Sequence, residues 1–379
     1  MTPETNPLAL YVHFPWCLRK CPYCDFTSFA LPNGRADFSP YLKALEDELS
    51  SESALAQGRV LASIYLGGGT PSLLSAREVG KLLETVSKLF TLAPDCEISM
   101  EANPGTVEKG RLAAFASAGV NRLSLGVQSF SDANLGALGR IHDAREALLA
   151  AEEARKAFAN FNLDVMFGLP GEDLAALETD IRTALALQST HLSFYELTIE
   201  EGTVFGKRPP RNLPDEDTLA AMQEAVVSGL EEAGFVHYEV SGYARPGFAC
   251  RHNLAYWTFG DYLAAGAGAH AKLTANLDGL VVSRSVRPSQ PAAYMQNPHA
   301  PWTQVSARDL PFEFMLNALR LSRGVPADSF EKRTGLPLSA IQAPLDEAKR
   351  LGLMDPDPRR LVATPLGLRY LSDLQALFL

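Results

Sequence analysis

Long uncharged hydrophobic runs are missing from this sequence. No stretch of about 18 apolar residues is free of charge, so we expect no transmembrane helix. The first residues, MTPETNPLALYVHF, contain neither the basic segment nor the apolar core of a signal peptide, so we expect a cytoplasmic protein. Excess positive charge is missing too, because 34 Lys and Arg residues are set against 44 Asp and Glu residues. The net charge of −10 therefore argues against nucleic acid as a partner.

Cysteine is also scarce, yet three of the five cysteines lie within eight residues, at Cys17, Cys21 and Cys24. Cytosolic thiols stay reduced, so this group predicts a metal centre rather than a disulfide. Thiolates are the usual ligands of iron–sulfur clusters, and three of them on one loop leave the fourth iron of a cubane open to a small ligand. A zinc site is the alternative, but it needs four protein ligands, and His13 is the only nearby candidate for the fourth. We therefore favour a [4Fe–4S] cluster, and we expect Cys96 to be a packed thiol.

Short apolar runs alternate with helical patterns over the first 200 residues. The runs that predict strands are Leu8–Phe14, Val60–Leu66, Glu97–Met100, Arg122–Val127, Phe161–Phe167 and His191–Leu197. The pair Ser39-Pro40 predicts the start of the first helix, with Ser39 as its N-cap. Ser75 and Glu78 predict a capping box at the second helix. The alternation implies an α/β fold with a parallel sheet, and we predict a partial (β/α)6 barrel. An open doubly wound sheet is the alternative that periodicity does not exclude.

The pattern changes after residue 208, which divides the chain into three predicted regions. Residues 1–208 form the barrel, residues 209–289 extend it, and residues 290–379 form a smaller C-terminal α+β domain with a winged-helix-like order of elements. Residues 244–271 are rich in glycine and aromatic residues, and we expect them to form surface loops that line a site. Between residues 301 and 379 ten Lys and Arg residues face nine Asp and Glu residues, so this domain has no basic face for nucleic acid.

Polar side chains recur at or near the ends of the predicted strands. They are Glu101, Gln128, Asp164, Tyr195 and Glu196. Active sites of barrels lie at the C-terminal ends of the strands, so this set predicts a site at that rim. The run Gly67-Gly68-Gly69-Thr70-Pro71 follows the second strand. Its glycines would allow a ligand to approach closely and would expose backbone N–H groups to it.

These motifs together resemble one known superfamily. The spacing Cys17-x3-Cys21-x2-Cys24 with an aromatic at Tyr23, the GGGTP run and the later EANP run are similar to the radical SAM superfamily, above all to its coproporphyrinogen III dehydrogenase-like branch. The resemblance implies that the open iron of a [4Fe–4S] cluster binds S-adenosylmethionine (SAM) and that SAM is cleaved to a 5′-deoxyadenosyl radical. It assigns the cofactor contacts to Tyr11, Tyr23, Gly68, Gly69, Thr70, Glu101, Gln128, Arg140 and Asp164. Two of these are carboxylates, which would stabilise the sulfonium cation of SAM.

Two features depart from the dehydrogenase pattern. That enzyme has a further cysteine two residues beyond the third ligand, where this sequence has Phe26. It also has a long N-terminal extension, whereas only ten residues precede Tyr11 here. The chain carries instead the string HNLAYW at residues 252–257, and this HNxxYW string resembles the HemW family of haem chaperones. The resemblance implies that the protein binds haem and passes it to acceptor haemoproteins.

The HNxxYW string also makes physical sense as a haem site. A neutral imidazole is a competent axial ligand, so His252 is the candidate ligand, with Asn253 beside it. Tyr256 and Trp257 would flank the flat macrocycle. A hydrogen-bonded structural histidine among core aromatics is the alternative, and the thiolate of Cys250 is a rival ligand. The sequence thus predicts a haem chaperone on a radical SAM scaffold.

Two other functions compete with this prediction. One is an enzyme, an oxygen-independent coproporphyrinogen III dehydrogenase or another radical SAM protein that abstracts hydrogen. The other is a regulator whose C-terminal domain binds nucleic acid, which the near-neutral charge of that domain argues against. Apolar residues near the C-terminus offer a surface for a partner or for weak membrane association, although we expect them to pack on their own domain; they are Leu371, Leu374, Leu377, Phe378 and Leu379.

Overall fold

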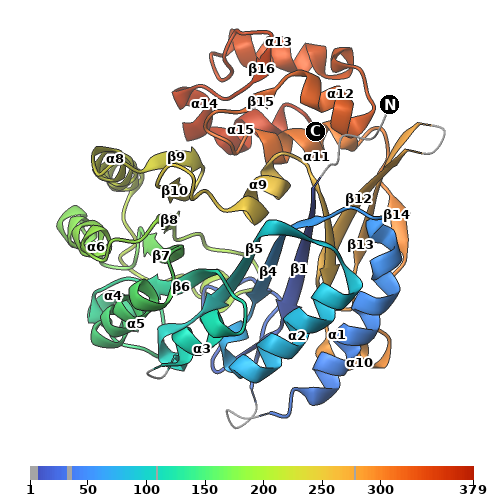
Figure 1. Ribbon diagram of the computed structural model, residues 1–379. Helices are drawn as coiled ribbons and strands as arrows, with labels where there is room; N and C mark the ends of the chain where they lie inside the picture. The colour runs from blue at the N-terminus through green and yellow to red at the C-terminus, as the bar shows by residue number, and fades with distance from the viewer. Residues whose placement is uncertain (1–6, 32–35, 108–109, 277–278) are drawn as a thin grey trace.

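A run of parallel strands forms the centre of the structure, a computed structural model that describes residues 7–31, 36–107, 110–276 and 279–379 (Figure 1). The strands are β1 (Leu8–Phe14), β4 (Leu61–Gly68), β5 (Leu92–Ala102), β6 (Arg122–Gln128), β7 (Phe161–Phe167) and β8 (His191–Glu196). They lie side by side in the order of the sequence, and each pairs in parallel with the next. All six predicted strands are therefore confirmed.

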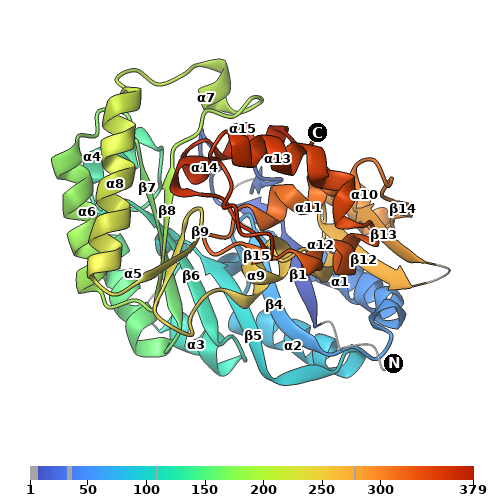
Figure 2. The ribbon, with the colours of Figure 1, turned by 90° about the horizontal axis from the view of Figure 1, so that it is seen from above.

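Helices cover the outer face of this sheet. They are α1 (Ser39–Glu52), α2 (Ala76–Leu89), α3 (Arg111–Ser117), α4 (Asp132–Ala137), α5 (Ala144–Ala157), α6 (Leu174–Ala186) and α8 (Glu216–Glu232). Right-handed crossovers between strands in sequential order bring the connecting helices to one face, whereas a doubly wound sheet reverses its strand order. The order is sequential from β1 to β8, so the fold is the predicted partial barrel. Figure 2 shows α4, α6 and α8 along the outer side of the curved sheet.

The α2 helix illustrates how the sequence builds this layer. Ser75 Oγ accepts a hydrogen bond from the Glu78 N–H at 3.2 Å, and the Glu78 carboxylate accepts one from the Ser75 N–H at 2.7 Å. This is the predicted capping box, which satisfies backbone donors that a helix start leaves unpaired. The buried residues Val79, Leu82, Leu83 and Val86 follow at helical spacing and join the main core.

The start of α1 differs from the prediction by one residue. Its N-cap is Phe38, and Ser39 is already helical. The carboxylate of Asp37 accepts a hydrogen bond from the Ser39 N–H at 2.9 Å. Asp37 therefore satisfies a backbone donor at this helix start, and the prediction that Ser39 caps the helix was wrong.

The segment after β8 extends the sheet at both edges. Its elements are α7 (Val204–Lys207), β9 (Val236–Glu239), β10 (Gly242–Ala244), α9 (Arg251–Trp257), β11 (Asp261–Ala265), β12 (His270–Asn276), β13 (Leu280–Val286), α10 (Pro291–Gln296) and β14 (Trp302–Gln304). At one edge β10 pairs antiparallel with β8, and β9 follows. At the other edge β11 pairs in parallel with β1, and β12, β13 and β14 follow in antiparallel pairs. The sheet thus reaches 12 strands.

Residues 244–271 line a cavity, as the sequence predicts, but only part of the segment is the predicted surface loop. They contain α9 and β11, and β11 is buried at every position. The strand is buried because it covers the edge of β1, which would otherwise present unpaired backbone groups. Glycine and aromatic residues therefore mark a tightly packed part of the core here.

A second, smaller hydrophobic core lies in the C-terminal part of the chain. Its elements are α11 (Leu310–Ala318), β15 (Val325–Pro326), α12 (Asp328–Thr334), α13 (Gln342–Arg350), β16 (Arg360–Leu361), α14 (Pro365–Arg369) and α15 (Leu371–Ala376). In Figure 1 this unit lies above the open side of the barrel, beside α9. Because α10 and β14 belong with the large sheet, we propose that the C-terminal unit begins after β14 rather than at residue 290.

The apolar C-terminal residues mostly pack on their own unit. Leu374 and Phe378 are buried in the second core, Leu371 and Leu377 pack against it, and Leu379 is 84% exposed. Among the residues that the structure describes, none of the helices has the length and apolar character needed to cross a membrane.

Candidate functional site

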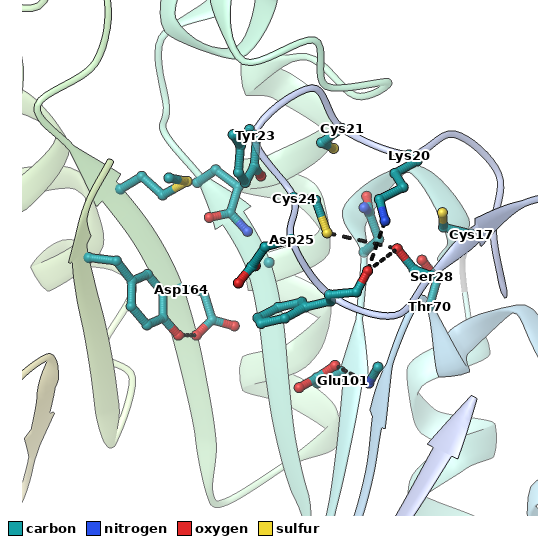
Figure 3. A pocket seen from close by; sticks show the side chains of 18 of the residues that line it. Cys17, Lys20, Cys21, Tyr23, Cys24, Asp25, Ser28, Thr70, Glu101 and Asp164 are labelled. Atoms are coloured by element: carbon teal, nitrogen blue, oxygen red, sulfur yellow. Dashed lines mark hydrogen bonds between the residues drawn. The ribbon is translucent and has the colours of Figure 1, made fainter. Parts of the chain in front are cut away.

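Three cysteines lie on one loop that follows β1 and edges a cavity of about 340 Å³ (Figure 3). Cys17 is buried, while Cys21 and Cys24 are partly exposed. The loop is fixed by backbone hydrogen bonds from Phe29 N–H to the Pro15 carbonyl and from Leu31 N–H to the Cys17 carbonyl, at 2.7 and 2.9 Å. The strand order puts this loop at the C-terminal end of β1, which is the rim that the sequence predicts.

Two of these thiols have raised pKa values and are therefore protonated near neutral pH. Burial, together with the neighbouring Cys24 and Cys21, raises the pKa of Cys17 to about 11. Burial also raises the pKa of Cys24. A metal that bound these thiols as thiolates would therefore displace their protons. Within the described ranges no group of three His, Cys, Asp or Glu side chains is arranged to hold a single metal ion.

Arg140 ties the cysteine loop to the strand ends. Its Nη1 donates to Cys21 Sγ and to Tyr23 Oη, each at 3.3 Å, and its Nη2 donates to the Gly126 carbonyl at 3.0 Å. A guanidinium beside a cysteine sulfur stabilises negative charge on that sulfur. Tyr23 packs at the same time against a small apolar cluster that includes Phe205. Both side chains predicted to contact the cofactor here therefore also position the loop.

The glycine run acts mainly through close packing of backbone. Gly68 has a φ of +113°, and a Cβ there would lie 2.5 Å from the ring of His13. The N–H groups of Gly68, Gly69 and Thr70 are all occupied, by the Glu101 carboxylate at 3.0 Å, the Phe14 carbonyl at 2.7 Å and the Trp16 carbonyl at 2.7 Å. The prediction that these N–H groups face a ligand was wrong. The three residues nevertheless line the cavity.

Glu101 lies near the end of β5 and faces the same cavity (Figure 3). Its carboxylate accepts hydrogen bonds from Tyr65 Oη and from the Gly68 N–H, both at 3.0 Å. Burial, together with the nearby charge of Asp164, raises the pKa of Glu101 to about 7. The site therefore carries a carboxylate that a bound cation would bring fully into its charged form.

Asp164 and Gln128 complete the polar side of the cavity. Asp164 accepts hydrogen bonds from Tyr195 Oη at 2.5 Å, Asn162 Nδ2 at 2.8 Å and Ser124 Oγ at 2.9 Å. Gln128 ends β6 with a φ of +70°, an uncommon backbone conformation for a residue other than glycine. Both residues line the cavity together with Glu101, Arg140 and the cysteines. The predicted set of polar strand ends is thus brought together at one rim.

A second cavity of about 570 Å³ adjoins the first and shares Asp25, Phe26, Gly68 and Glu101 with it. Five aromatic side chains contribute to its lining: Tyr11, Phe26, Tyr256, Trp257 and Tyr262. Tyr11 was predicted beside SAM, but it lines this second cavity and pairs through its hydroxyl with His13 Nδ1 at 3.0 Å. Phe26, at the position where the dehydrogenase has a further cysteine, lies between the two cavities and is 63% exposed.

The HNxxYW residues divide between this cavity and the core. Tyr256 and Trp257 line the cavity, whereas His252 and Asn253 are among the lining residues of neither cavity. His252 is 1% exposed, and its Nδ1 pairs with Ser63 Oγ at 3.2 Å and its Nε2 with Tyr256 Oη at 2.9 Å.

The surroundings of His252 are those of a structural histidine. Burial lowers the pKa of its imidazole to about 3, and the nearby guanidinium of Arg122 adds to the shift. The ring also stacks on Tyr65 at 5.0 Å between centroids. The rival ligand Cys250 is fully buried, and burial raises its pKa to about 12. The geometry therefore fits the alternative in which His252 is a hydrogen-bonded core residue.

Sequence reasoning missed several residues that line the two cavities. Lys20 and Tyr65 line the first, and His270, Tyr262 and Arg284 line the second. His270 starts β12, in the run HAKLTAN. Polar residues alternate there with apolar ones, which is the signal of a half-buried strand and would have separated this run from the glycine-rich turn before it.

Two family models match this chain. The model of the radical SAM superfamily matches residues 11–184, and the model of the HemN C-terminal domain matches residues 305–370. The heme chaperone HemW of Escherichia coli strain K12 is 46% identical over 375 residues and covers 98% of each chain. The heme chaperone HemW of Haemophilus influenzae is 42% identical over 382 residues, which span 100% of this chain and 99% of the other.

A solved structure also resembles this one. The coproporphyrinogen III oxidase HemN from Escherichia coli, described as a radical SAM enzyme, superposes with a TM-score of 0.80 and 21% identity, over 98% of this chain and 90% of that one. At this level of identity the likeness concerns the fold alone. It supports the partial barrel with its additional C-terminal unit.

Proposed function

Since this chain belongs to the HemW family within the radical SAM superfamily, we propose that it is a haem chaperone, which binds haem and passes it to acceptor haemoproteins. In this proposal the first cavity holds a [4Fe–4S] cluster and SAM, and the second holds haem. We further propose that the protein acts in the cytoplasm. We also propose that its partners are haem and acceptor haemoproteins and that it does not bind nucleic acid.

The second cavity is the observation that carries this proposal. It has aromatic walls, its volume of about 570 Å³ lies in the range of small-molecule sites, and two residues of the HNxxYW string line it. Flat aromatic side chains suit the faces and edges of a porphyrin. This aromatic cavity adjoins the cysteine loop, so a haem bound in it would lie beside the proposed cluster.

The residues of the first cavity fit the cluster and SAM. Cys17, Cys21 and Cys24 would bind three irons, and the open iron would take the amino and carboxylate groups of SAM. A reduced cluster supplies an electron for cleavage of the carbon–sulfur bond of SAM. The carboxylates of Glu101 and Asp164 face the same space and would stabilise the sulfonium.

The remaining predicted contacts divide by cavity. Gly68, Gly69, Thr70, Gln128 and Arg140 line the first cavity, so we retain them as residues that shape the SAM site. We assign Tyr11 to the wall of the haem cavity instead, because it lines only the second. Tyr23 remains assigned to the first cavity, which it also lines.

A transfer assay tests the proposed function. Protein purified without oxygen is loaded with haem and mixed with the apo form of a haem enzyme, whose recovered activity reports delivery. We expect recovery that depends on the loaded chaperone and is faster than with an equal amount of free haem.

The rival enzyme function makes a different prediction. An oxygen-independent coproporphyrinogen III dehydrogenase would release 5′-deoxyadenosine when coproporphyrinogen III is added under reducing conditions. Release of that product, together with no delivery of haem, would overturn the chaperone proposal and support the dehydrogenase.

A further inference from the structure

The histidines of this chain differ in whether their ring nitrogens are free. There are seven histidines in the sequence. Two of them line the second cavity, His13 and His270. His13 is committed at both nitrogens, because Nδ1 pairs with Tyr11 Oη at 3.0 Å and Nε2 with the Thr27 carbonyl at 2.8 Å. His252 is committed at both nitrogens as well, and it lines neither cavity.

His270 stands apart from both. It is the first residue of β12, its side chain is exposed, and its ring takes part in none of the side-chain hydrogen bonds among the described residues. A ring nitrogen must have a free lone pair to bind iron, and His270 offers one at the cavity wall without breaking any existing contact. The ring is exposed yet partly desolvated by the surrounding protein, and this desolvation and the nearby guanidiniums of Arg284 and Arg287 lower the pKa of His270, so the imidazole is neutral near pH 7.

The turn before β12 packs closely against the cysteine loop and so fixes the position of His270. Gly268 has a φ of +78°, and a Cβ there would lie 2.7 Å from the side chain of Thr27. Gly268 and Ala269, two residues with small side chains, line the cavity together with His270. Arg287 N–H donates to the Ala269 carbonyl at 3.0 Å, which anchors the turn to the end of β13. The His270 ring is thereby presented to the cavity from a fixed backbone.

We propose that His270, and not His252, supplies the axial ligand to haem in the second cavity, an inference that rests on the proposed haem binding. Tyr256 and Trp257 form the wall of this cavity. His252 is then a positioning residue, which holds the Tyr256 hydroxyl at 2.9 Å from its Nε2. The guanidinium of Arg320 lies 4.3 Å from the centre of the Trp257 ring and supports that side chain from outside.

In this assignment the HNxxYW string forms and supports the cavity wall and does not bind iron. Freeing His252 for iron would require loss of its bonds to Ser63 and Tyr256 and exposure of a side chain that is 1% exposed. A buried polar group that loses its hydrogen-bond partners is left unsatisfied, which destabilises the protein. His270 requires no such rearrangement.

A ligand exchange tests the assignment. Wild type, His270→Cys, His270→Ala and His252→Cys are purified without oxygen, matched for iron content and circular dichroism, and titrated with haem. The optical and electron paramagnetic resonance spectra then report the axial ligand. We expect a histidine-type spectrum for wild type and a thiolate-type spectrum for His270→Cys, while His270→Ala loses at least about tenfold in haem affinity.

The His252→Cys variant is the matched control, since it introduces the same thiol at the rival position. We expect it to keep the histidine-type spectrum of wild type. A thiolate-type spectrum in His252→Cys, with wild-type spectra in both His270 variants, would overturn the assignment to His270. If wild type itself binds no haem, the proposed function fails, and this outcome is distinct from retained binding in His270→Ala, which overturns only the inference about the ligand.

Discussion

The protonation of one carboxylate, Glu101, should control how tightly the proposed SAM site binds a cation. Its carboxylate is buried beside Asp164, and its pKa is raised to about 7, chiefly by burial. A cation bound next to it favours the charged form and so competes with the proton. The affinity for a cationic ligand should therefore rise as the pH rises through about 7.

We expect SAM to bind the cluster-loaded protein about tenfold more weakly at pH 6 than on the plateau above pH 8, because one pH unit below the relevant pKa costs about tenfold. Equilibrium dialysis under anaerobic conditions measures this. Glu101→Gln should bind more weakly at every pH and lose the pH dependence. Glu196→Gln is the control, because Glu196 lines the same cavity without an assigned SAM contact, and it should keep the dependence. If the affinity of Glu101→Gln for SAM depended on pH as in wild type, the assignment of Glu101 to the SAM site would be wrong.

Residue-level predictions succeeded where spacing along the chain carries the chemistry. The cysteines and the polar strand ends line one cavity, because neighbours in sequence or strand ends in one sheet are necessarily close. The ligand role of His252 could not be judged in this way. Whether an imidazole nitrogen is free depends on Ser63 and Tyr256, and Ser63 lies 189 residues away in sequence.

At the scale of elements, the capping box of α2 provides a direct test of how local sequence stabilises the barrel. Ser75 lies outside both cavities, and its side chain satisfies a backbone donor at the helix start. We expect Ser75→Ala to lower the free energy of unfolding by about 1 kcal/mol, measured by denaturant titration. Ser87→Ala, on the exposed face of the same helix, should change it by less than about 0.5 kcal/mol. Equal effects of the two substitutions would refute the capping role.

Element boundaries show where local patterns fail. At the start of α1 both Asp37 and Ser39 have side chains that could accept a hydrogen bond from a free backbone N–H. The carboxylate of Asp37 accepts one, from the Ser39 N–H. For residues 244–271 the glycine and aromatic content is the same in a surface loop and in a crowded core strand. What distinguishes them is the pairing of β11 with β1, two segments about 250 residues apart in sequence. No window of local sequence contains that information.

At the scale of the whole molecule, a buried ion pair joins α1 to the sheet extension. Arg287 Nε donates to Glu48 at 2.5 Å, and both side chains are fully buried. The Glu48 carboxylate also accepts hydrogen bonds from Tyr294 Oη at 2.5 Å and from the Gly266 N–H at 2.9 Å. This one carboxylate thus connects the barrel with the turn after β11, the end of β13 and α10.

We expect Glu48→Ala to lower the free energy of unfolding by about 3 kcal/mol, because it leaves two buried polar groups without this partner and leaves Glu52, 3.0 Å from Arg287 Nη2, as the remaining carboxylate beside the buried charge. Lys43→Ala is the control on the same helix, since its pair with Asp47 is exposed and should contribute less than about 1 kcal/mol. Denaturant titration followed by circular dichroism measures both. A loss below 1 kcal/mol in Glu48→Ala would show that this contact does not hold the extension to the barrel.

The sheet order separates the predicted barrel from its doubly wound alternative, which the strand patterns alone did not do. The sheet also shows how the second cavity arises. Its walls come from the cysteine loop, α9, α11 and the ends of strands on both sides of β1, and this combination exists only once β11 has paired with β1. The haem site proposed here is therefore a property of the assembled fold, whereas the cysteine motif is a property of one loop.

The most direct test of the central claim is an anaerobic titration of the wild-type protein with haem, followed at the Soret band. We expect saturable binding of one haem per chain and a histidine-type spectrum, with the [4Fe–4S] absorption retained. Absence of a saturable Soret change in protein that holds its cluster and folds normally would contradict it, and the second cavity would then need a different ligand.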